Sequence, residues 1–134
     1  MSHGINKVAI LDVPITDTTI WKVRLDCENP YVDIGVSISK SNNLDGNAKR
    51  KGSWSIFSRN GCAYQPNNDK GTRFTTQFNE NDTITVRVDV NQGKASVKYF
   101  RNNTDLGVAF KNLDTPIYPY FMFTAKDVKV TIVD

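Results

Sequence analysis

The sequence predicts an all-β protein: an antiparallel β-sandwich of two packed sheets, in one domain and with essentially no helix. Five segments alternate apolar and polar residues with a period of two, which is typical of half-buried antiparallel strands. Turns separate these segments, and a turn every 8 to 12 residues, roughly, favours a sandwich or barrel. No window of about eleven residues shows the 3.6-residue period of a helix. At 134 residues, the chain 1–134 has the length of one domain that buries its own core.

The first alternating segment, WKVRLDC at 21–27, puts Trp21 and Leu25 on one face and charged residues on the other. The remaining alternating segments are 32–38, 83–90, 95–100 and 128–132. Two short strands are expected at 107–110 and 117–123. Pro119 has no backbone N–H and therefore belongs at the start or the edge of its strand.

The last five strands are expected to run up and down, so that successive turns alternate between the two ends of the sandwich. This places 79–82, 101–107 and 124–127 at one end, and 91–94 and 112–116 at the other. Residues 40–53, KSNNLDGNAKRKGS, are polar and lack hydrophobic periodicity. A loop of this length in a compact domain is often functional.

The composition fits a folded protein without a metal or a cofactor. With 39% hydrophobic and 23% charged residues, wholesale disorder is not expected. No run approaches the roughly 18 to 20 apolar residues of a membrane helix, and the N-terminus lacks the apolar centre of a signal peptide. We therefore expect an intracellular, cytoplasmic location. Cys27, Cys62 and the single histidine, His3, give no zinc-ligand spacing, and two reduced thiols are favoured over a disulfide.

The net charge of +3 is concentrated in one segment. Residues 1–44 carry four Lys/Arg and five Asp/Glu (net −1), residues 45–79 carry six and two (net +4), and residues 80–134 carry seven of each. We expect 45–79 to be rich in loops and to meet any electrostatic partner. A solvated surface without a partner is the simpler interpretation of the same charges.

A catalytic function is not expected. A single histidine near the terminus leaves no Ser-His-Asp or Cys-His arrangement, and no GxGxxG or GxxxxGK[ST] motif is present. Carboxylates such as Asp26, Asp33, Asp82 and Asp105 fall mostly on outward strand positions or turns, where surface charge explains them. The sequence therefore indicates no catalytic residue and no cofactor.

A set of motifs occurs in order along residues 20–133: WKVRLD, VDIGVSIS, GSWSI, Gly61, NDTITVRVD, KYFRNN, LGVAF and YPYFMF. In this order they resemble the SPRY domain family, the β-sandwich core of the larger PRY-SPRY modules. The chain departs from the family at two turns, with Asn81 and Asn103 where glycine is usual. Asn tolerates positive φ better than other non-glycine residues, so both turns can keep their geometry. No separate PRY segment is evident before Trp21.

The resemblance implies a non-enzymatic adaptor that binds a short segment of another protein, as in ubiquitin-ligase substrate recognition or scaffold assembly. In SPRY domains, loops at one end of the sandwich bind such a segment. Carried over by position, the loops at 40–52 and 124–127 form this site, and the alternation of turns adds 101–103. The candidate partner-binding residues are Asn42, Asn43, Leu44, Asn47, Lys49, Arg50, Lys51, Arg101, Asn102, Asn103, Thr124, Ala125 and Lys126.

The five cations in this set favour an acidic partner, mainly by raising the association rate. We expect a modest affinity, on the order of micromolar. Reversing the charges of Arg101 and Lys126 together is expected to abolish binding and to change the melting temperature by no more than a few degrees.

Two other functions remain open at this point. The basic residues of 49–73, interleaved with Trp54, Phe57 and Tyr64, suit nucleic acid or another polyanion, although Trp54 matches a structural motif of the family and is expected to pack inward. A lectin-like site would need an exposed aromatic ring, for which Tyr31 and Tyr64 are candidates on fold analogy alone. Membrane binding is not expected.

Overall fold

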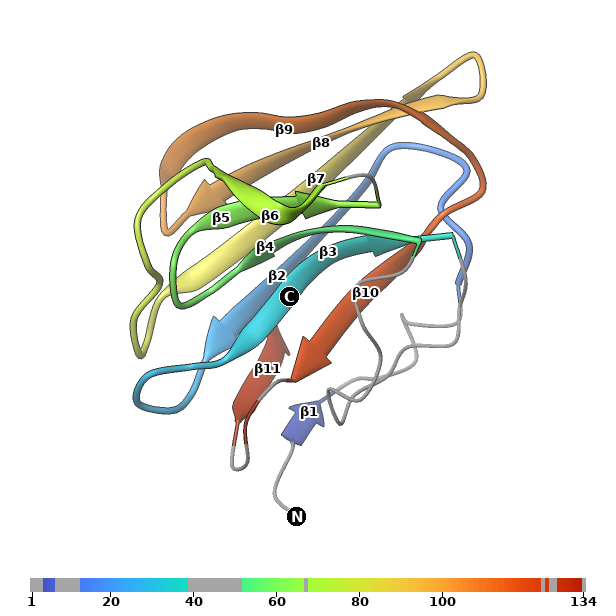
Figure 1. Cartoon of the computed structure of the whole chain (residues 1–134). Coiled ribbons are helices and arrows are strands. Elements are labelled where there is room, and N and C mark those ends of the chain that lie inside the picture. The colour runs from blue at the N-terminus through green and yellow to red at the C-terminus, as the bar shows by residue number, and fades with distance from the viewer. Residues whose placement is uncertain are drawn as a thin grey trace.

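The computed structural model describes residues 4–6, 13–38, 52–66, 68–123, 125 and 128–133. These residues form eleven strands and, within the same ranges, no helix (Figure 1). The strands are β1 (Gly4–Asn6), β2 (Thr19–Leu25), β3 (Val32–Ser37), β4 (Ser53–Phe57), β5 (Cys62–Gln65), β6 (Asn68–Arg73), β7 (Thr83–Asn91), β8 (Lys94–Arg101), β9 (Thr104–Asp114), β10 (Tyr118–Phe123) and β11 (Lys129–Val133).

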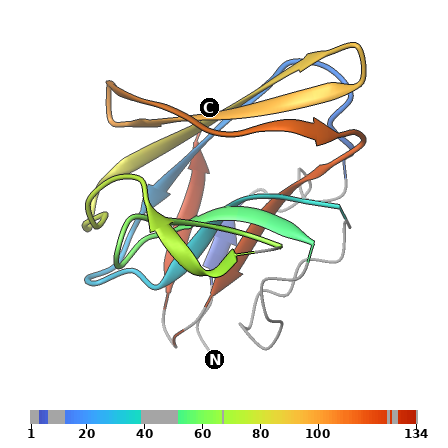
Figure 2. The ribbon, with the colours of Figure 1, turned by 45° about the horizontal axis from the view of Figure 1, so that its top comes forward.

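The strands form two sheets, one above the other in Figure 2. The six-stranded sheet has the order β1-β11-β2-β7-β8-β9, and the five-stranded sheet has the order β10-β3-β4-β5-β6. β1 pairs with β11 in parallel, and the other pairings between described strands are antiparallel. The predicted two-sheet antiparallel sandwich is therefore confirmed.

Alternation of apolar and polar residues places one face of each inner strand in a common core. In β2, for example, Val23 and Leu25 are fully buried while Lys22 and Arg24 are exposed. Tyr99, in β8, joins the two sheets, because its buried hydroxyl donates a 2.7 Å hydrogen bond to the carbonyl oxygen of Ile34 in β3. Burial raises the pKa of Tyr99 well above its ordinary value, so its hydroxyl remains a donor.

In two of the turns, an asparagine adopts the left-handed backbone conformation, with positive φ. Asn81 has a φ of 71°, as the sequence predicts, and Asn102 has a φ of 55°. The prediction for Asn103 is wrong, since the left-handed residue of that turn is Asn102. Its amide oxygen accepts a 3.0 Å hydrogen bond from the backbone N–H of Thr83, which fixes the turn to the start of β7.

Gly35 and Gly107 meet different needs. A Cβ on Gly35 would lie 1.9 Å from the carbonyl oxygen of Trp54, so the close approach of β3 and β4 requires glycine. At Gly107 no atom lies within 4 Å of such a Cβ, and glycine is required by the φ of 94°. The interpretation that Gly107 is present to permit a close backbone approach is therefore wrong. The strand that contains it is Thr104–Asp114, longer than the predicted 107–110.

The basic segment 45–79 holds three strands in its described part, where the sequence predicted loops. β4 extends the five-stranded sheet, and β5 and β6 form its outer edge. Their sequences, CAYQ and NDKGTR, lack apolar alternation, and their pairing shifts register between Ala63 and Gln65. Pro119 lies where predicted, because β10 is an edge strand of its sheet.

Turns gather at two ends of the sandwich, at the left and the right of Figure 1. The Tyr31 end comprises residues 26–31, 58–61, 79–82, 102–103 and 125. The Val13 end comprises 13–18, 38, 52, 92–93 and 115–117. The predicted placement of turns 79–82 and 102–103 at one end, and of 92–93 and 115–116 at the other, is thus confirmed.

Candidate functional site

The described residues beside the predicted loop 40–52 and the described residues 101–103 lie at opposite ends of the sandwich. β3 and β10 are antiparallel, so the chain leaves these two strands at opposite ends. Ile38 and Gly52, which flank the predicted loop 40–52, lie at the Val13 end, where the Ile38 N–H donates a 2.9 Å hydrogen bond to the Gly52 carbonyl oxygen. Asn102 and Ala125 lie at the Tyr31 end. The residues beside this loop therefore do not share an end with 101–103, and the part of the loop that lies outside the described residues stays a prediction.

Four of the predicted partner-binding residues are described: Arg101, Asn102, Asn103 and Ala125. Asn102 and Asn103 are the exposed turn between β8 and β9, and Ala125 packs, partly buried, against the core. Their role in binding stays a prediction. The residues Asn42, Asn43, Leu44, Asn47, Lys49, Arg50, Lys51, Thr124 and Lys126 lie outside the described residues.

Three neighbours hold the Arg101 side chain. Its guanidinium Nη2 lies 2.8 Å from Asp82 Oδ2, Nε donates to the same oxygen at 3.0 Å, and Nη1 donates to Thr76 Oγ1 at 3.0 Å. The guanidinium also lies 5.6 Å from the centroid of the Phe78 ring. The side chains of Arg101 and Asp82 are only 20% and 14% exposed. These contacts tie Arg101 into the fold and weigh against the expectation that reversing its charge, together with that of Lys126, changes the melting temperature by no more than a few degrees.

Asp82 connects the two turns of this end. Its Oδ2 also accepts a 2.8 Å hydrogen bond from the backbone N–H of Asn79, and its Oδ1 accepts one of 3.2 Å from Asn102 Nδ2. A single carboxylate therefore binds the turn 79–82, Arg101 and Asn102 together. Hydrogen bonds to a charged group are stronger than neutral ones, so this carboxylate joins the two turns to each other.

A cluster of two rings and one cation lies at the same end. Tyr31 is 41% exposed, and the guanidinium carbon of Arg59 lies 5.4 Å from the centroid of its ring, within the range of a cation–π contact. The ring of Phe57 meets Tyr31 edge-on, with centroids 6.1 Å apart and planes at 60°. We call Tyr31, Phe57 and Arg59 the Tyr31 cluster.

Ser58 fixes the backbone beneath the Tyr31 cluster. Its side chain is fully buried, its N–H donates to the Val32 carbonyl oxygen at 3.0 Å, and its hydroxyl accepts a 2.9 Å hydrogen bond from the Val32 N–H. The N–H of Phe78 donates to the Ser58 carbonyl oxygen at 2.7 Å. The backbone of Phe78, whose ring lies under Arg101, is thus hydrogen-bonded to the turn that carries Arg59. The Tyr31 cluster and the Arg101–Asp82 pair are therefore connected through Ser58 and Phe78.

Comparison with known proteins identifies the family of this fold. The family model of the SPRY domain matches residues 18–134. The chain belongs to the SPRY domain family. Among the solved structures, 31 chains match it. One of them is the crystal structure of the SPRY domain of human HERC1, with a TM-score of 0.70 and 22% sequence identity, covering 92% of this chain and 79% of that chain. This likeness shows the fold alone. A search of the curated proteins finds no match.

SPRY domains are in general modules of protein interaction, and the family is a non-enzymatic fold. The resemblance drawn from the ordered motifs is therefore confirmed. In the described part of this SPRY domain, no helix is long and apolar enough to cross a membrane, and no three side chains gather as a metal site. Cys27 and Cys62 are free thiols, as the sequence favoured.

Other candidates from the sequence have structural roles in this SPRY domain. Trp54 packs, partly buried, against the core, as expected. Tyr64 is buried, and its hydroxyl accepts a 2.9 Å hydrogen bond from Asn60 Nδ2. Asp33 is fully buried and accepts a 3.0 Å hydrogen bond from Ser55 Oγ, so its interpretation as surface charge is wrong.

Carboxylates also pair with cations beside the 102–103 turn. Lys98 Nζ donates to Asp105 Oδ2 at 2.9 Å, and the Gly107 N–H donates to Oδ1 at 2.7 Å. The hydrogen bond from Lys98, and then the one from Gly107, hold the pKa of Asp105 below its ordinary value. Lys98 and Arg101 are thus engaged with carboxylates, whereas Arg59 lies over a neutral ring.

Sequence reasoning placed Phe57 and the basic residues of 49–73, Arg59 among them, in the polyanion candidate and Tyr31 in the lectin-like one, and did not bring the three residues together. Phe57 is in register with Asp33 across β3 and β4, and position 31 has the same parity as position 33. Tyr31 and Phe57 therefore share one face of the five-stranded sheet. This register depends on a pairing across an irregular connection, which the period-two pattern does not predict.

Proposed function

We propose that this SPRY domain binds a short, extended segment of a partner protein at its Tyr31 end, as an adaptor that performs no chemistry. The Tyr31 cluster is the observation that carries the proposal. Tyr31, a residue that is 41% exposed, has its ring in contact with a cation and with a second ring. Tyr and Arg are enriched among the residues that contribute most to protein interfaces.

The Tyr31 cluster suggests the chemistry of the bound segment. An arginine stacked on a ring keeps its N–H donors available at the edge for a carboxylate or a backbone carbonyl, while the ring supplies apolar surface. We therefore propose that the segment carries an acidic residue that meets Arg59 and an apolar side chain that packs on Tyr31. Asn102, Asn103, Thr124, Ala125 and Lys126 join this proposed site on sequence grounds. Residues 42–51 stay a separate prediction, because their described flanks lie at the other end.

The surroundings of the cluster support binding without a large rearrangement. Ser58 and the Arg101–Asp82 pair tie the turns of this end to the strands. A surface that is already ordered loses less conformational entropy when it binds. We expect an affinity on the order of micromolar, as is common for small recognition surfaces.

Polyanion binding by the basic segment 49–73 is the second candidate. The exposure of Lys70 and Arg73 in β6 favours it. The packing of Trp54 and Tyr64 weighs against it, since neither offers an exposed ring for base stacking. The lectin-like alternative rests on fold analogy and is not proposed. We also propose an intracellular, cytoplasmic location, in accord with the two free thiols.

Selection from a random peptide library, followed by calorimetry on the selected peptide, tests the proposed function. Tyr31→Ala and Arg59→Glu should each weaken binding about tenfold or more, a loss of about 1.4 kcal/mol. Lys111→Glu is the matched control, because Lys111 is exposed in β9 and the substitution changes the net charge equally. It should leave the affinity within about twofold.

Two results would contradict the proposal. Equal weakening by Lys111→Glu and Arg59→Glu would show that net charge, not the cluster, determines binding. Binding of single-stranded nucleic acid that falls steeply with salt, together with failure to select any peptide, would favour the polyanion candidate.

A further inference from the structure

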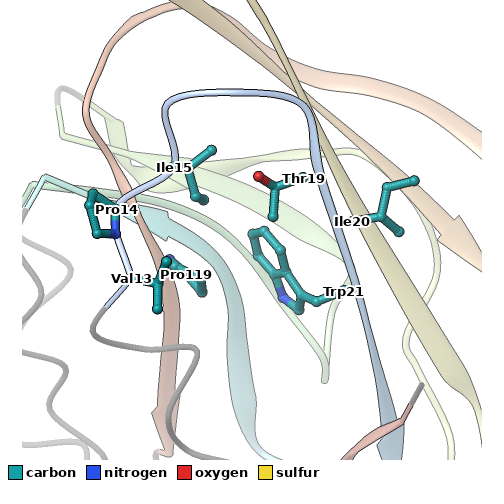
Figure 3. A pocket seen from close by; sticks show the side chains of 7 residues that line it. All are labelled: Val13, Pro14, Ile15, Thr19, Ile20, Trp21 and Pro119. Carbon is teal, nitrogen blue, oxygen red and sulfur yellow. The ribbon is translucent and has the colours of Figure 1, made fainter.

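The outer face of the six-stranded sheet carries a row of exposed side chains that crosses β2, β7, β8 and β9. The strand register sets Ile20 of β2 opposite Arg87 of β7. Arg87 in turn lies opposite Lys98 of β8, and Lys98 lies opposite Val108 of β9. Residues directly opposite each other in antiparallel strands share one face of the sheet. Figure 3 shows the side chains of Ile20 and of the buried Trp21 on opposite sides of β2, so the row faces away from the core. We call Ile20, Arg87, Lys98 and Val108 the Arg87 row.

The Arg87 row is open to solvent along its length. Ile20 and Val108 are 55% and 49% exposed, and they are two of the five large hydrophobic residues that are exposed in the described part of the chain. The side chains of Arg87 and Lys98, which lie between them, are 44% and 31% exposed. The surface therefore offers two aliphatic contacts with two cations in between.

Three cations are neighbours on this face. Arg87 and Lys98 are directly opposite, and like charges in such positions destabilise a strand pair. Lys22 lies opposite Thr85, two residues from Arg87, and is therefore a diagonal neighbour of Arg87. Lys22 is exposed, and in the described part of the chain it has no ion-pair partner. An anion placed over these cations would offset their repulsion.

The nearest carboxylates lie beside the row. Asp89 accepts a 3.1 Å hydrogen bond from Arg87 Nε, and Asp105 accepts one of 2.9 Å from Lys98 Nζ. Asp89 follows Arg87 by two residues along β7. Asp105 lies opposite Phe100, two residues from Lys98 on the other side of the row. At about 3.4 Å per residue, the backbones of both acids are roughly 7 Å from the row. Exposed ion pairs are weak, so a partner's carboxylate can take the place of either acid.

We propose that the Arg87 row is a docking surface for an acidic amphipathic helix of a partner protein. Carboxylates in the middle of one helix face pair with Arg87 and Lys98. Apolar side chains toward the ends of that face pack on Ile20 and Val108. Neighbouring strands are about 4.8 Å apart, so the row spans about 14 Å, which a helix covers in roughly two to three turns.

A helix suits this face better than an extended segment does. β7 and β8 are inner strands, whose backbone N–H and C=O groups bond to a strand on each side. An extended segment laid across them finds no backbone partner, whereas a helix bonds its own backbone groups. A helix is about 10 Å wide, so it also fits between Asp89 and Asp105.

Wider or like-charged partners fit less well. A bilayer or a nucleic acid would cover Asp89 and Asp105 as well as the cations, and these carboxylates would repel it. A second copy of this chain would bring the same cations against the row. A narrow acidic helix meets the cations and avoids the carboxylates.

This inference is separate from the function proposed for the Tyr31 end. The Tyr31 cluster belongs to the five-stranded sheet, and the Arg87 row lies on the outer face of the other sheet. One domain can therefore hold two partner segments at once, as a scaffold does. Failure of one proposal does not decide the other.

Nuclear magnetic resonance of the isotope-labelled full chain with designed peptides tests the proposal. The first peptide is an alanine-based helix with a leucine near each end of one face and glutamates on the turns between them. The second has glutamine in place of each glutamate, and the third has a central proline, which breaks the helix. The first peptide should shift the backbone amides of the Arg87 row saturably. It should bind about tenfold or more tighter than the second and the third.

Matched variants locate the binding. Arg87→Gln removes a charge from the row and should weaken the first peptide about fivefold or more. Gln65→Glu changes the net charge equally at an exposed position of β5, in the other sheet, and should leave the affinity within about twofold. Ile20→Ala should weaken the first peptide about threefold or more, whereas Ile38→Ala, at a position 62% exposed at the Val13 end, should not.

The proposal is overturned if none of the peptides binds, if all three bind equally, or if the shifts centre away from the row. Vesicles of phosphatidylserine and phosphatidylcholine, and oligothymidine, are tested in parallel. Binding of either that Arg87→Gln abolishes, without binding of the first peptide, would assign the row to a membrane or to nucleic acid instead. Shifts of the row that depend on protein concentration alone would indicate self-association and would also overturn the proposal.

Discussion

Removal of the Arg101 side-chain charge should destabilise the fold, and the size of the loss follows from the contacts. Arg101→Met keeps much of the apolar stem and deletes the guanidinium. The lost interactions are the paired contacts of 2.8 and 3.0 Å to Asp82, the 3.0 Å hydrogen bond to Thr76 and the contact with the Phe78 ring. The substitution also leaves Asp82, 14% exposed, without its counter-ion.

Two limits bracket the loss of unfolding free energy. Exposed ion pairs contribute about 0 to 1 kcal/mol, and breaking a fully buried pair costs about 3 to 5 kcal/mol. With side chains 20% and 14% exposed, the Arg101–Asp82 pair lies between these limits, and we expect a loss of about 2 to 3 kcal/mol. An unfolding entropy of about 2.1 cal/mol/K per residue gives roughly 0.28 kcal/mol/K for this chain, so Tm should fall by about 7 to 11 °C.

Arg87→Met is the matched control for this prediction. Arg87 pairs with Asp89 at 3.1 Å, but both side chains are 44% exposed, so the same substitution should cost less than about 0.5 kcal/mol. Urea denaturation and differential scanning calorimetry of the two variants supply the comparison. A loss from Arg101→Met no larger than that from Arg87→Met would refute the reasoning. A double-mutant cycle with Asp82→Asn should give a coupling of about 1 to 2 kcal/mol between these neighbours.

Three further predictions concern the core and the pH dependence of stability. Tyr99→Phe should lower the free energy of unfolding by about 1 kcal/mol. It should also remove part of the stability loss above roughly pH 10, because the raised pKa keeps the buried phenol protonated at pH values where the phenol of the unfolded chain ionises. Urea denaturation at pH values from about 8 to about 11 measures both effects. Gly35→Ala should cost at least about 3 kcal/mol by calorimetry, since its Cβ would lie 1.9 Å from the Trp54 carbonyl oxygen. Asp105→Asn should flatten the acid limb of the plot of stability against pH. The pKa of Asp105 is lower in the folded chain than in the unfolded one, so the carboxylate stabilises the fold at pH values above its unfolded pKa, and this stability is lost as the pH falls through its folded pKa. Stability profiles that superimpose on the wild type would contradict each prediction.

Much of the fold follows from local pattern. β2 and β8 match their predicted segments because each buries one face in a two-layer core, which imposes alternation. β3 and β7 also match their predicted segments, although all six residues of β3 are buried. Pro119 could be placed at an edge because it lacks a donor. β5 and β6 escaped prediction because an outer edge with a shifted register does not need an apolar face on every second residue.

The candidate site depended on contacts that no local pattern encodes. Arg101 appears in the sequence as a turn cation, and only the fold brings Asp82 and Phe78, about twenty residues earlier, against it. The alternation of turns predicted which of the late turns share an end, but it could not follow the connection that leaves β3. The antiparallel pairing of β3 with β10 sets Ile38 and Ala125 at opposite ends.

The most direct measurement is a titration of the isotope-labelled domain with a library-selected peptide, following backbone amide shifts residue by residue. Binding at the Tyr31 end predicts the largest shifts at Tyr31, at 57–60 and at 102–103, with loss of those shifts in Arg59→Glu. Shifts centred on Trp21 and Ile20, or spread over 68–73, would contradict this assignment of the partner-binding surface.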